Sequence, residues 1–253
     1  MKHGKPERKW YTVDALSGAH AEIWIYEEIG SDFWGEGLTA KKFVEELAAL
    51  DVEHIALHIN SPGGSVFDGQ AIYNALVRHP ASVTTYIDGV AASIASVVAL
   101  AGDTVEMAAN ALFMIHDPWG ATAGTAADMR TMAGLLDKIT GTMLDVYEAK
   151  SALDRADIAA AMSAETWYTA AEAQAAGYAD SIGTPVQVAA LSRFDLEALG
   201  YRHGREALAK VTTENADPDA VAAPGDAAAP AATDRGLVFV PGHGFYKINP
   251  RKE

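Results

Sequence analysis

Short apolar runs alternate with helical patterns from residue 21 to residue 183, and this alternation restricts the fold more than any other feature of the sequence. The segment 93–101 is apolar on every side, so a helix there must be enclosed by the rest of the fold. These patterns predict an α/β domain. We expect strands at 21–26, 54–59, 83–87, 104–107 and 112–115, and helices at 67–78, 93–101 and 126–150.

A change of composition near residue 205 divides the chain. No basic residue occurs between Lys210 and Arg235, where Ala, Pro and Asp dominate, as is typical of disordered linkers. The sequence beyond is apolar and aromatic again but too short for a domain. We therefore predict an N-terminal segment (1–19), a main domain (20–204), an Ala/Pro/Asp-rich linker (205–235) and a short apolar C-terminal segment (236–253).

Charge and cysteine content exclude several function classes. Nineteen basic and 34 acidic residues give a net charge of −15, which opposes general binding to nucleic acid or to anionic lipid. The chain has no cysteine, so disulfides, thiolate catalysis and cysteine metal sites are excluded. Protein or small-molecule substrates are therefore expected, and a covalent nucleophile must be Ser, Thr or Lys.

No segment predicts export or membrane insertion. Residues 1–13 are charged and lack the apolar core of a secretory signal. The longest apolar run, 90–102, is shorter than the roughly 20 residues that span a bilayer. We therefore expect a cytoplasmic protein without membrane partners.

The turn NSPGGS at 60–65 lies between an expected strand and an expected helix. Its two glycines allow backbone N–H groups to approach a ligand oxygen closely, as an oxyanion site requires. It lacks the Gly-Lys-Ser/Thr of a nucleotide phosphate loop. An ordinary loop remains the alternative interpretation.

Ser93 and His116 are the side chains best placed for nucleophilic catalysis. Ser93 begins the enclosed helix, where the next amide and the helix dipole stabilise negative charge, although an ordinary N-cap is the alternative. His116 directly follows an apolar strand and can act as a general base, although a lone histidine is more often structural. His54 and His58 share a strand at a separation of roughly 13 Å, so we do not expect them to bind a metal.

Together these motifs resemble the ClpP-like serine peptidases over roughly residues 20–183. The resemblance implies a ClpP/crotonase-type spiral of β-β-α units that assembles into homo-oligomeric rings. It is carried by INSPGGS (59–65), GVAAS (89–93), MIHDPWG (114–120) and ETWYTAAEAQAAGYAD (165–180).

The resemblance also implies roles for four residues. Ser93 corresponds to the nucleophile and His116 to the base, and the backbone amides of Gly64 and Ile94 correspond to the oxyanion hole. Peptide hydrolysis of this kind requires neither a metal nor an organic cofactor.

The third member of the implied triad departs from the better-known bacterial enzymes. Those enzymes carry Asp two residues before an aromatic, whereas Glu165 stands two residues before Trp167 here. A glutamate can hold an imidazole by the same hydrogen bond with a longer reach. An exposed carboxylate without a catalytic role is the alternative interpretation, with Asp157 or Asp180 as substitutes.

The divergent core, the Glu165 substitution and the Ala/Pro-rich extension resemble phage-encoded head maturation (prohead) peptidases. Such enzymes process scaffold and capsid precursors, either in the host cytoplasm or in the assembling head. A ClpP paralogue that works with an ATP-driven unfoldase is the alternative within the class. Outside it stand a crotonase-like acyl-CoA enzyme, which would need no Ser-His pair, and a non-catalytic capsid assembly protein. A serine-lysine peptidase would need a lysine base, but Lys138 and Lys150 lie on the polar side of the long helix or beyond it.

The expected helix 126–150 carries a long apolar stripe. In ClpP-like peptidases the corresponding helix contacts a neighbouring subunit. A purely intramolecular core helix is the alternative.

Overall fold

The computed structural model describes six ranges of the chain: 11–15, 19–30, 39–186, 194–214, 237–240 and 244–247. Two compact units are present. The first comprises residues 1–117 and 143–215, and the second comprises residues 118–142 and 216–253. Each unit is described by itself.

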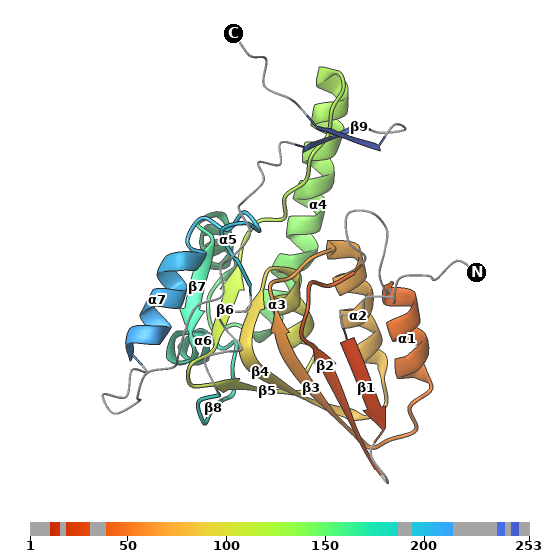
Figure 1. Cartoon of the computed structure of the whole chain (residues 1–253), viewed down its shortest axis with the longest axis vertical. Helices are drawn as coiled ribbons and strands as arrows, with labels where there is room; N and C mark the ends of the chain where they lie inside the picture. The colour runs from red at the N-terminus through yellow and green to blue at the C-terminus, as the bar shows by residue number, and fades with distance from the viewer. Residues whose placement is uncertain are drawn as a thin grey trace, which may run out of the picture. The chain divides into compact units, whose positions relative to one another are not determined.

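The first unit is built on an eight-stranded mixed sheet (Figure 1). The main path runs β1-β2-β3-β4-β5-β8, while β6 pairs with β4 and β7. Only the β1–β2 and β6–β7 pairs are antiparallel. The strands are β1 (Tyr11–Ala15), β2 (His20–Ile25), β3 (His54–Ser61), β4 (Ser82–Ala92), β5 (Thr104–Ala108), β6 (Leu112–Ile115), β7 (Thr166–Thr169) and β8 (Ser181–Gly183).

Strand β4 is long enough to pair with two neighbours in succession on one side. Its residues 84–87 pair with β5, and its residues 90–92 pair with β6. On its other side the register against β3 shifts between Ile59 and Ser61. The carboxyl ends of β3, β4 and β6 therefore meet at one place, which is where ligands bind in many parallel sheets.

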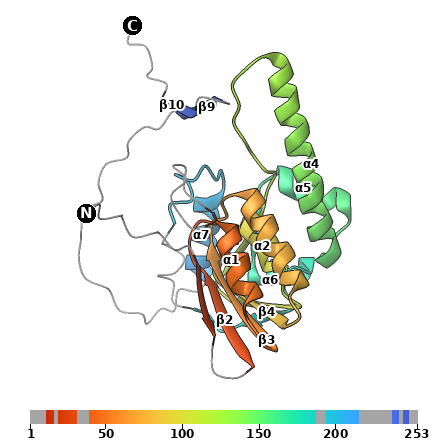
Figure 2. The same cartoon turned by 90° about the vertical axis from the view of Figure 1, so that its right-hand side faces the viewer.

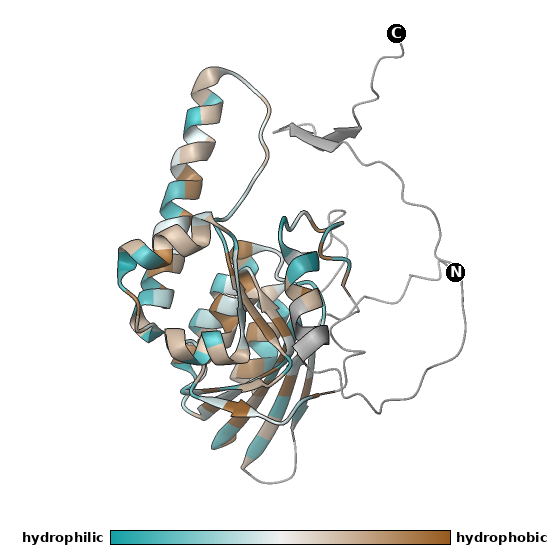
Figure 3. Cartoon of the chain, turned by 90° about the vertical axis from the view of Figure 1, so that its left-hand side faces the viewer, coloured by the Kyte–Doolittle hydropathy of each residue, from teal (hydrophilic) through white to brown (hydrophobic). Residues whose placement is uncertain are grey.

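The helices are α1 (Ala40–Ala48), α2 (Val66–Arg78), α3 (Ile94–Ala99), α4 (Ala126–Lys150), α5 (Arg155–Ser163), α6 (Ala170–Ala176) and α7 (Gly204–Glu214). Helices α1 and α2 pack against each other, and both lie in front of the sheet in Figure 2. Alternate residues of β2, β3 and β4 are buried, and Figure 3 shows the same alternation as brown and teal bands along the strands. All six residues of α3 are buried, as the enclosed helix predicted from the sequence requires.

The predicted strands and helices have counterparts here, which confirms the α/β fold class. Strand β4 extends five residues beyond the predicted end at residue 87. Strand β1 and helix α1 were not among the predicted elements, and β1 lies within the predicted N-terminal segment 1–19. Helix α7 (Gly204–Glu214) begins at the predicted end of the main domain, but residues 205–214, which were predicted as the start of the linker, are helical.

The C-terminal part is described only in pieces. Most of the predicted disordered linker, residues 215–235, lies outside the described residues. In the second unit, β9 (Leu237–Val240) and β10 (Gly244–Lys247) form an antiparallel hairpin. Within the described ranges, no helix combines the length and the apolar character needed to cross a membrane.

Two buried hydroxyl groups secure the start of α3. The Ser96 hydroxyl donates to the Ser93 carbonyl at 2.5 Å, and it lies 2.7 Å from the Tyr147 hydroxyl. Because a serine has a single hydroxyl hydrogen, Tyr147 must be the donor in the second bond. Both side chains are fully buried, so neither hydroxyl can turn to water instead.

We predict that Ser96→Ala lowers the free energy of unfolding by about 1–3 kcal/mol, because it leaves the Tyr147 hydroxyl buried without a partner. Urea denaturation followed by tryptophan fluorescence measures the change. Adding Tyr147→Phe should restore part of the loss, because the orphaned hydroxyl is then gone. A double variant as unstable as the sum of its single variants would contradict this pairing.

Candidate active site

Ser93 occupies a strained turn between β4 and α3. Its backbone angles are φ 55° and ψ −130°, and its side chain does not cap the helix that follows. Within the described residues, Ser93 and Glu165 are the non-glycine residues with positive φ. Such conformations cost about 1–3 kcal/mol and gather at functional sites. The ordinary N-cap interpretation of Ser93 therefore lacks its defining hydrogen bond.

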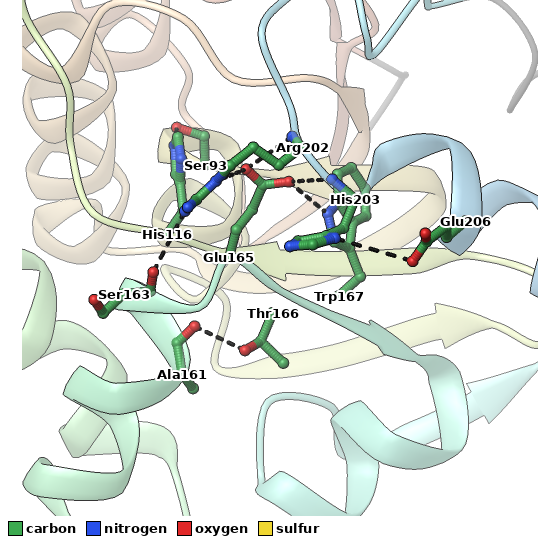
Figure 4. Close-up of polar contacts among 10 residues, drawn as sticks. All are labelled: Ser93, His116, Ala161, Ser163, Glu165, Thr166, Trp167, Arg202, His203 and Glu206. Atoms are coloured by element: carbon green, nitrogen blue, oxygen red, sulfur yellow. Dashed lines mark hydrogen bonds and ion pairs between the residues drawn. The ribbon is translucent and has the colours of Figure 1, made fainter.

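The Ser93 hydroxyl is instead hydrogen-bonded to His116, with 2.7 Å between Oγ and Nε2. Figure 4 shows the two side chains meeting beside Glu165. Both residues are 8% exposed. The backbone N–H of Ser93 donates to the carbonyl of Met114 in β6, two residues before His116, at 3.1 Å. Strand pairing thus sets the distance between the two side chains.

Burial lowers the pKa of His116, while the charges of Glu165 and Asp117 oppose that shift and Arg202 adds to it. The imidazole is therefore neutral at pH 7. A neutral imidazole hydrogen-bonded to a serine hydroxyl can accept its proton.

The glycine turn packs directly against Ser93. A Cβ atom at Gly63 would lie 2.8 Å from the Ser93 Cβ, so only glycine permits this approach. The Val90 amide of β4 donates to Asn60 Oδ1 at 3.2 Å, and this bond ties the turn to β4. The Ser61 hydroxyl accepts from the Gly63 amide at 3.2 Å. These contacts hold the turn rigidly beside the serine.

Gly64 and Ile94 contribute backbone amides near Ser93. Ile29 bonds to both neighbours of Gly64, donating to the Gly63 carbonyl at 2.7 Å and accepting from the amide of residue 65 at 2.9 Å. In a parallel ladder this pattern directs the Gly64 N–H away from Ile29. Ile94 is the first residue of α3, where an N–H has no acceptor in its own helix.

Glu165 is 4% exposed, and several groups bind its carboxylate directly. Its oxygens accept from the amides of Arg202 at 3.0 Å and His203 at 2.9 Å, and from Trp167 Nε1 at 3.3 Å. The Arg202 Nε lies 3.5 Å away. Within the described residues no hydrogen bond joins Glu165 to the imidazole, although the resemblance implied one. The carboxylate is directed instead to the amides of Arg202 and His203 and to Trp167.

Burial alone would raise the pKa of Glu165, but the amide hydrogen bonds from His203 and Arg202 outweigh it, and the net shift is downward. Trp167 and His116 add to this downward shift. The carboxylate is therefore ionised at pH 7 and acts on His116 through its charge.

The substitutes considered from the sequence lie elsewhere. Asp157 is exposed in the first turn of α5, and Asp180 accepts from the Val105 amide at 2.7 Å. Neither is among the charges that shift the pKa of His116. Lys150, considered as a lysine base, donates to the Gly102 carbonyl at 2.8 Å instead.

The sequence interpretation missed a group of contacts from residues 201–203. The Tyr201 ring meets the rings of His116 and Trp167 edge to face, with centroids 5.5 and 5.7 Å away, and its hydroxyl donates to the Pro62 carbonyl. Arg202 contacts Glu165 through both its backbone amide and its guanidinium. No spacing or motif marks these residues, because two of the contacts to Glu165 are made by backbone amides that any residue could supply.

The family model described as Clp protease matches residues 7–186. The ATP-dependent Clp protease proteolytic subunit 1 of Mycobacterium tuberculosis is 36% identical over 156 residues, covering 56% of this chain and 72% of the relative. Subunit 1 of Leifsonia xyli is 32% identical over 163 residues, covering 63% and 81%. Subunit 2 of Thermobifida fusca is 34% identical over 151 residues, covering 57% and 74%.

We predict that Gly64→Ala slows the modification of Ser93 by a fluorophosphonate probe by about 100-fold or more. The added methyl group would overlap the Ile29 carbonyl oxygen, so the turn must move and carry its amide with it. Rate constants of labelling, measured by mass spectrometry, give the effect. Gly134→Ala is the matched control, because no atom lies within 4 Å of its added methyl group. A folded Gly64→Ala variant that labels as fast as this control contradicts the prediction.

Proposed function

Because this chain belongs to the Clp protease family of serine peptidases, we propose that Ser93 is its nucleophile and His116 its general base. The observation that carries the proposal is the 2.7 Å hydrogen bond between Ser93 Oγ and His116 Nε2. It joins a serine on a strained turn to an imidazole that burial keeps neutral.

In the proposed mechanism, Ser93 attacks the carbonyl carbon of a peptide bond while His116 takes the hydroxyl proton. The amides of Gly64 and Ile94 bind the resulting oxyanion. His116 then gives its proton to the departing amine, and an acyl-enzyme remains on Ser93. Water, deprotonated by His116, hydrolyses this ester and restores the serine. Neither a metal nor an organic cofactor takes part.

Glu165 is the proposed third member. When His116 takes up the serine proton it becomes a buried cation, and a buried cation is unstable without an anion nearby. The ionised carboxylate beside it offsets this cost electrostatically. This role needs charge and proximity, and it does not need a direct hydrogen bond in the resting enzyme.

We further propose that the substrates are scaffold and capsid precursors of a phage, cleaved during head maturation. The support is the divergent core, the glutamate in place of aspartate, and the Ala/Pro/Asp-rich stretch that follows the matched residues 7–186. An enzyme confined with its substrates meets them at high effective concentration. It would therefore need no ATP-driven delivery.

A second candidate is a housekeeping subunit that works with an ATP-dependent unfoldase. The observation that favours it is the name of the relatives, which are proteolytic subunits of ATP-dependent Clp proteases. Clp proteases form homo-oligomeric rings. Under either candidate we propose that α4 supplies a subunit contact, because Met129 and Leu135 are 43% and 42% exposed while Tyr147 is buried.

We predict that Ser93→Ala and His116→Ala each lower peptidase activity by about 10⁴-fold or more, because the two residues act as one unit in proton transfer. Hydrolysis of an unstructured protein, followed by gel electrophoresis, measures the loss, and circular dichroism checks the fold. Glu165→Gln keeps the shape and removes the charge, so a large drop in kcat is expected. Substantial hydrolysis by either Ser93→Ala or His116→Ala would falsify the mechanism.

The biological role is tested by co-expression with the scaffold and major capsid proteins encoded beside this gene. We expect discrete cleavage of these precursors without added nucleotide, and none with Ser93→Ala. Mass spectrometry of the products gives the cleavage sites. Intact precursors, together with degradation of unrelated proteins only after an unfoldase and ATP are added, would favour the housekeeping candidate instead.

A further inference from the structure

We propose that residues 201–203, called the strap below, position the Glu165 carboxylate for catalysis. The inference rests on the proposed function, and it assigns a part of the active site to a segment beyond the Clp protease match, which ends at residue 186. The strap residues are positioning residues, because they act through Glu165 and His116 and not on the substrate.

The first observation is the number of contacts that the strap makes with one carboxylate. Arg202 and His203 direct successive backbone amides at the two oxygens, Oε2 and Oε1 respectively, at 3.0 and 2.9 Å. Two donors in one short segment fix both the position and the rotation of the carboxylate plane. Within the part of the chain that the structure describes, Trp167 supplies the one other direct hydrogen bond to this carboxylate, a longer one of 3.3 Å.

The second observation is burial. A carboxylate that is 4% exposed has lost most of its water, so protein donors must replace it if the group is to stay ionised. Among the groups that lower the pKa of Glu165, the amides of His203 and Arg202 have the largest effects. Without the strap, the negative charge that supports His116 would lose its main stabilisation.

The third observation is that the strap is anchored at both ends. On one side, the Tyr201 hydroxyl donates to the Pro62 carbonyl, and its ring packs on His116. Behind it, Ala207 of α7 is buried against Leu112 and other residues of β4 and β6. The strap is therefore tied to the glycine turn, to the imidazole and to the core, which a positioning element requires.

The experiment removes one amide while leaving the rest of the chain. His203→Pro deletes the N–H that donates to Glu165, and His203 lies just before α7, where no hydrogen bond within the helix needs that N–H. His203→Ala keeps this N–H and loses only the imidazole. Rate constants for modification of Ser93 by the fluorophosphonate probe are measured for both, with circular dichroism and thermal unfolding as checks of the fold. We expect the proline variant to react about 10- to 100-fold more slowly than the alanine variant.

The pH dependence gives a readout that a merely structural role would not move. Three charged neighbours act on His116: Glu165 and Asp117 raise its pKa, and Arg202 lowers it. The Tyr201 ring beside it stays neutral, because burial raises the pKa of its phenol. The acid limb of the labelling rate reports protonation of His116. In the proline variant the carboxylate charge weakens or moves away, so the pKa of His116 falls further. The limb then shifts to lower pH, in the same direction as in Glu165→Gln.

A second pair of variants and a double-mutant cycle keep the test decisive if His203→Pro does not fold. Arg202→Pro and Arg202→Ala both remove the guanidinium, and only the first removes the amide that donates to Glu165. In a Glu165→Gln background, His203→Pro should cost at most a few-fold, because the carboxylate that it positions is gone.

The outcomes separate the two levels of the proposal. Absence of Ser93 labelling in the wild type overturns the proposed function and the strap's role with it. With Ser93 reactive, equal rates and equal acid limbs in the Pro and Ala variants overturn the strap's role alone. Faster labelling in a folded proline variant also overturns it, because the strap would then hold the carboxylate away from His116.

Discussion

The double pairing of β4 is the constraint on which the site depends. Because its last residues pair with β6, Ala92 lies opposite Met114, and the side chains that follow, Ser93 and His116, emerge at the same end of the sheet. The bond between them is then a consequence of register. A one-residue slip between the two strands would turn every side chain of the slipped strand to the other face and separate the pair. The shift in β3 opposite the same part of β4 brings the glycine turn to the serine.

The site also depends on the protonation states of two buried groups. His116 and Glu165 are both buried, and burial disfavours the charged form of each. The imidazole responds by staying neutral, whereas the carboxylate is kept ionised by amide donors from Arg202 and His203. The two groups thus rest in the protonation states that the proposed base and its proposed supporting anion require. For the carboxylate, the amide hydrogen bonds thus offset the effect of burial on its pKa.

Much of this arrangement could be predicted from the sequence, and the limits have physical causes. The sequence motifs predicted that Ser93 and His116 each follow a strand, and in the structure they directly follow β4 and β6. Residues 88–92 were not predicted as strand, because glycine and alanine have low strand propensity and their pairing with β6 is a tertiary effect. Strand β1 is a short edge strand stabilised by β2. The strap was missed because backbone donors leave no signature in residue type.

The glutamate at position 165 is consistent with the presence of the strap. Its backbone is held at φ 53°, so the direction of its side chain is fixed by a strained turn after α5. From that turn, the carboxylate must reach the amides of Arg202 and His203 and still lie close enough to affect the pKa of His116. The extra methylene of glutamate supplies this reach, whereas an aspartate would have to give up the strap or approach it by moving the turn. The glutamate side chain and the strap therefore act together to hold a buried negative charge near His116.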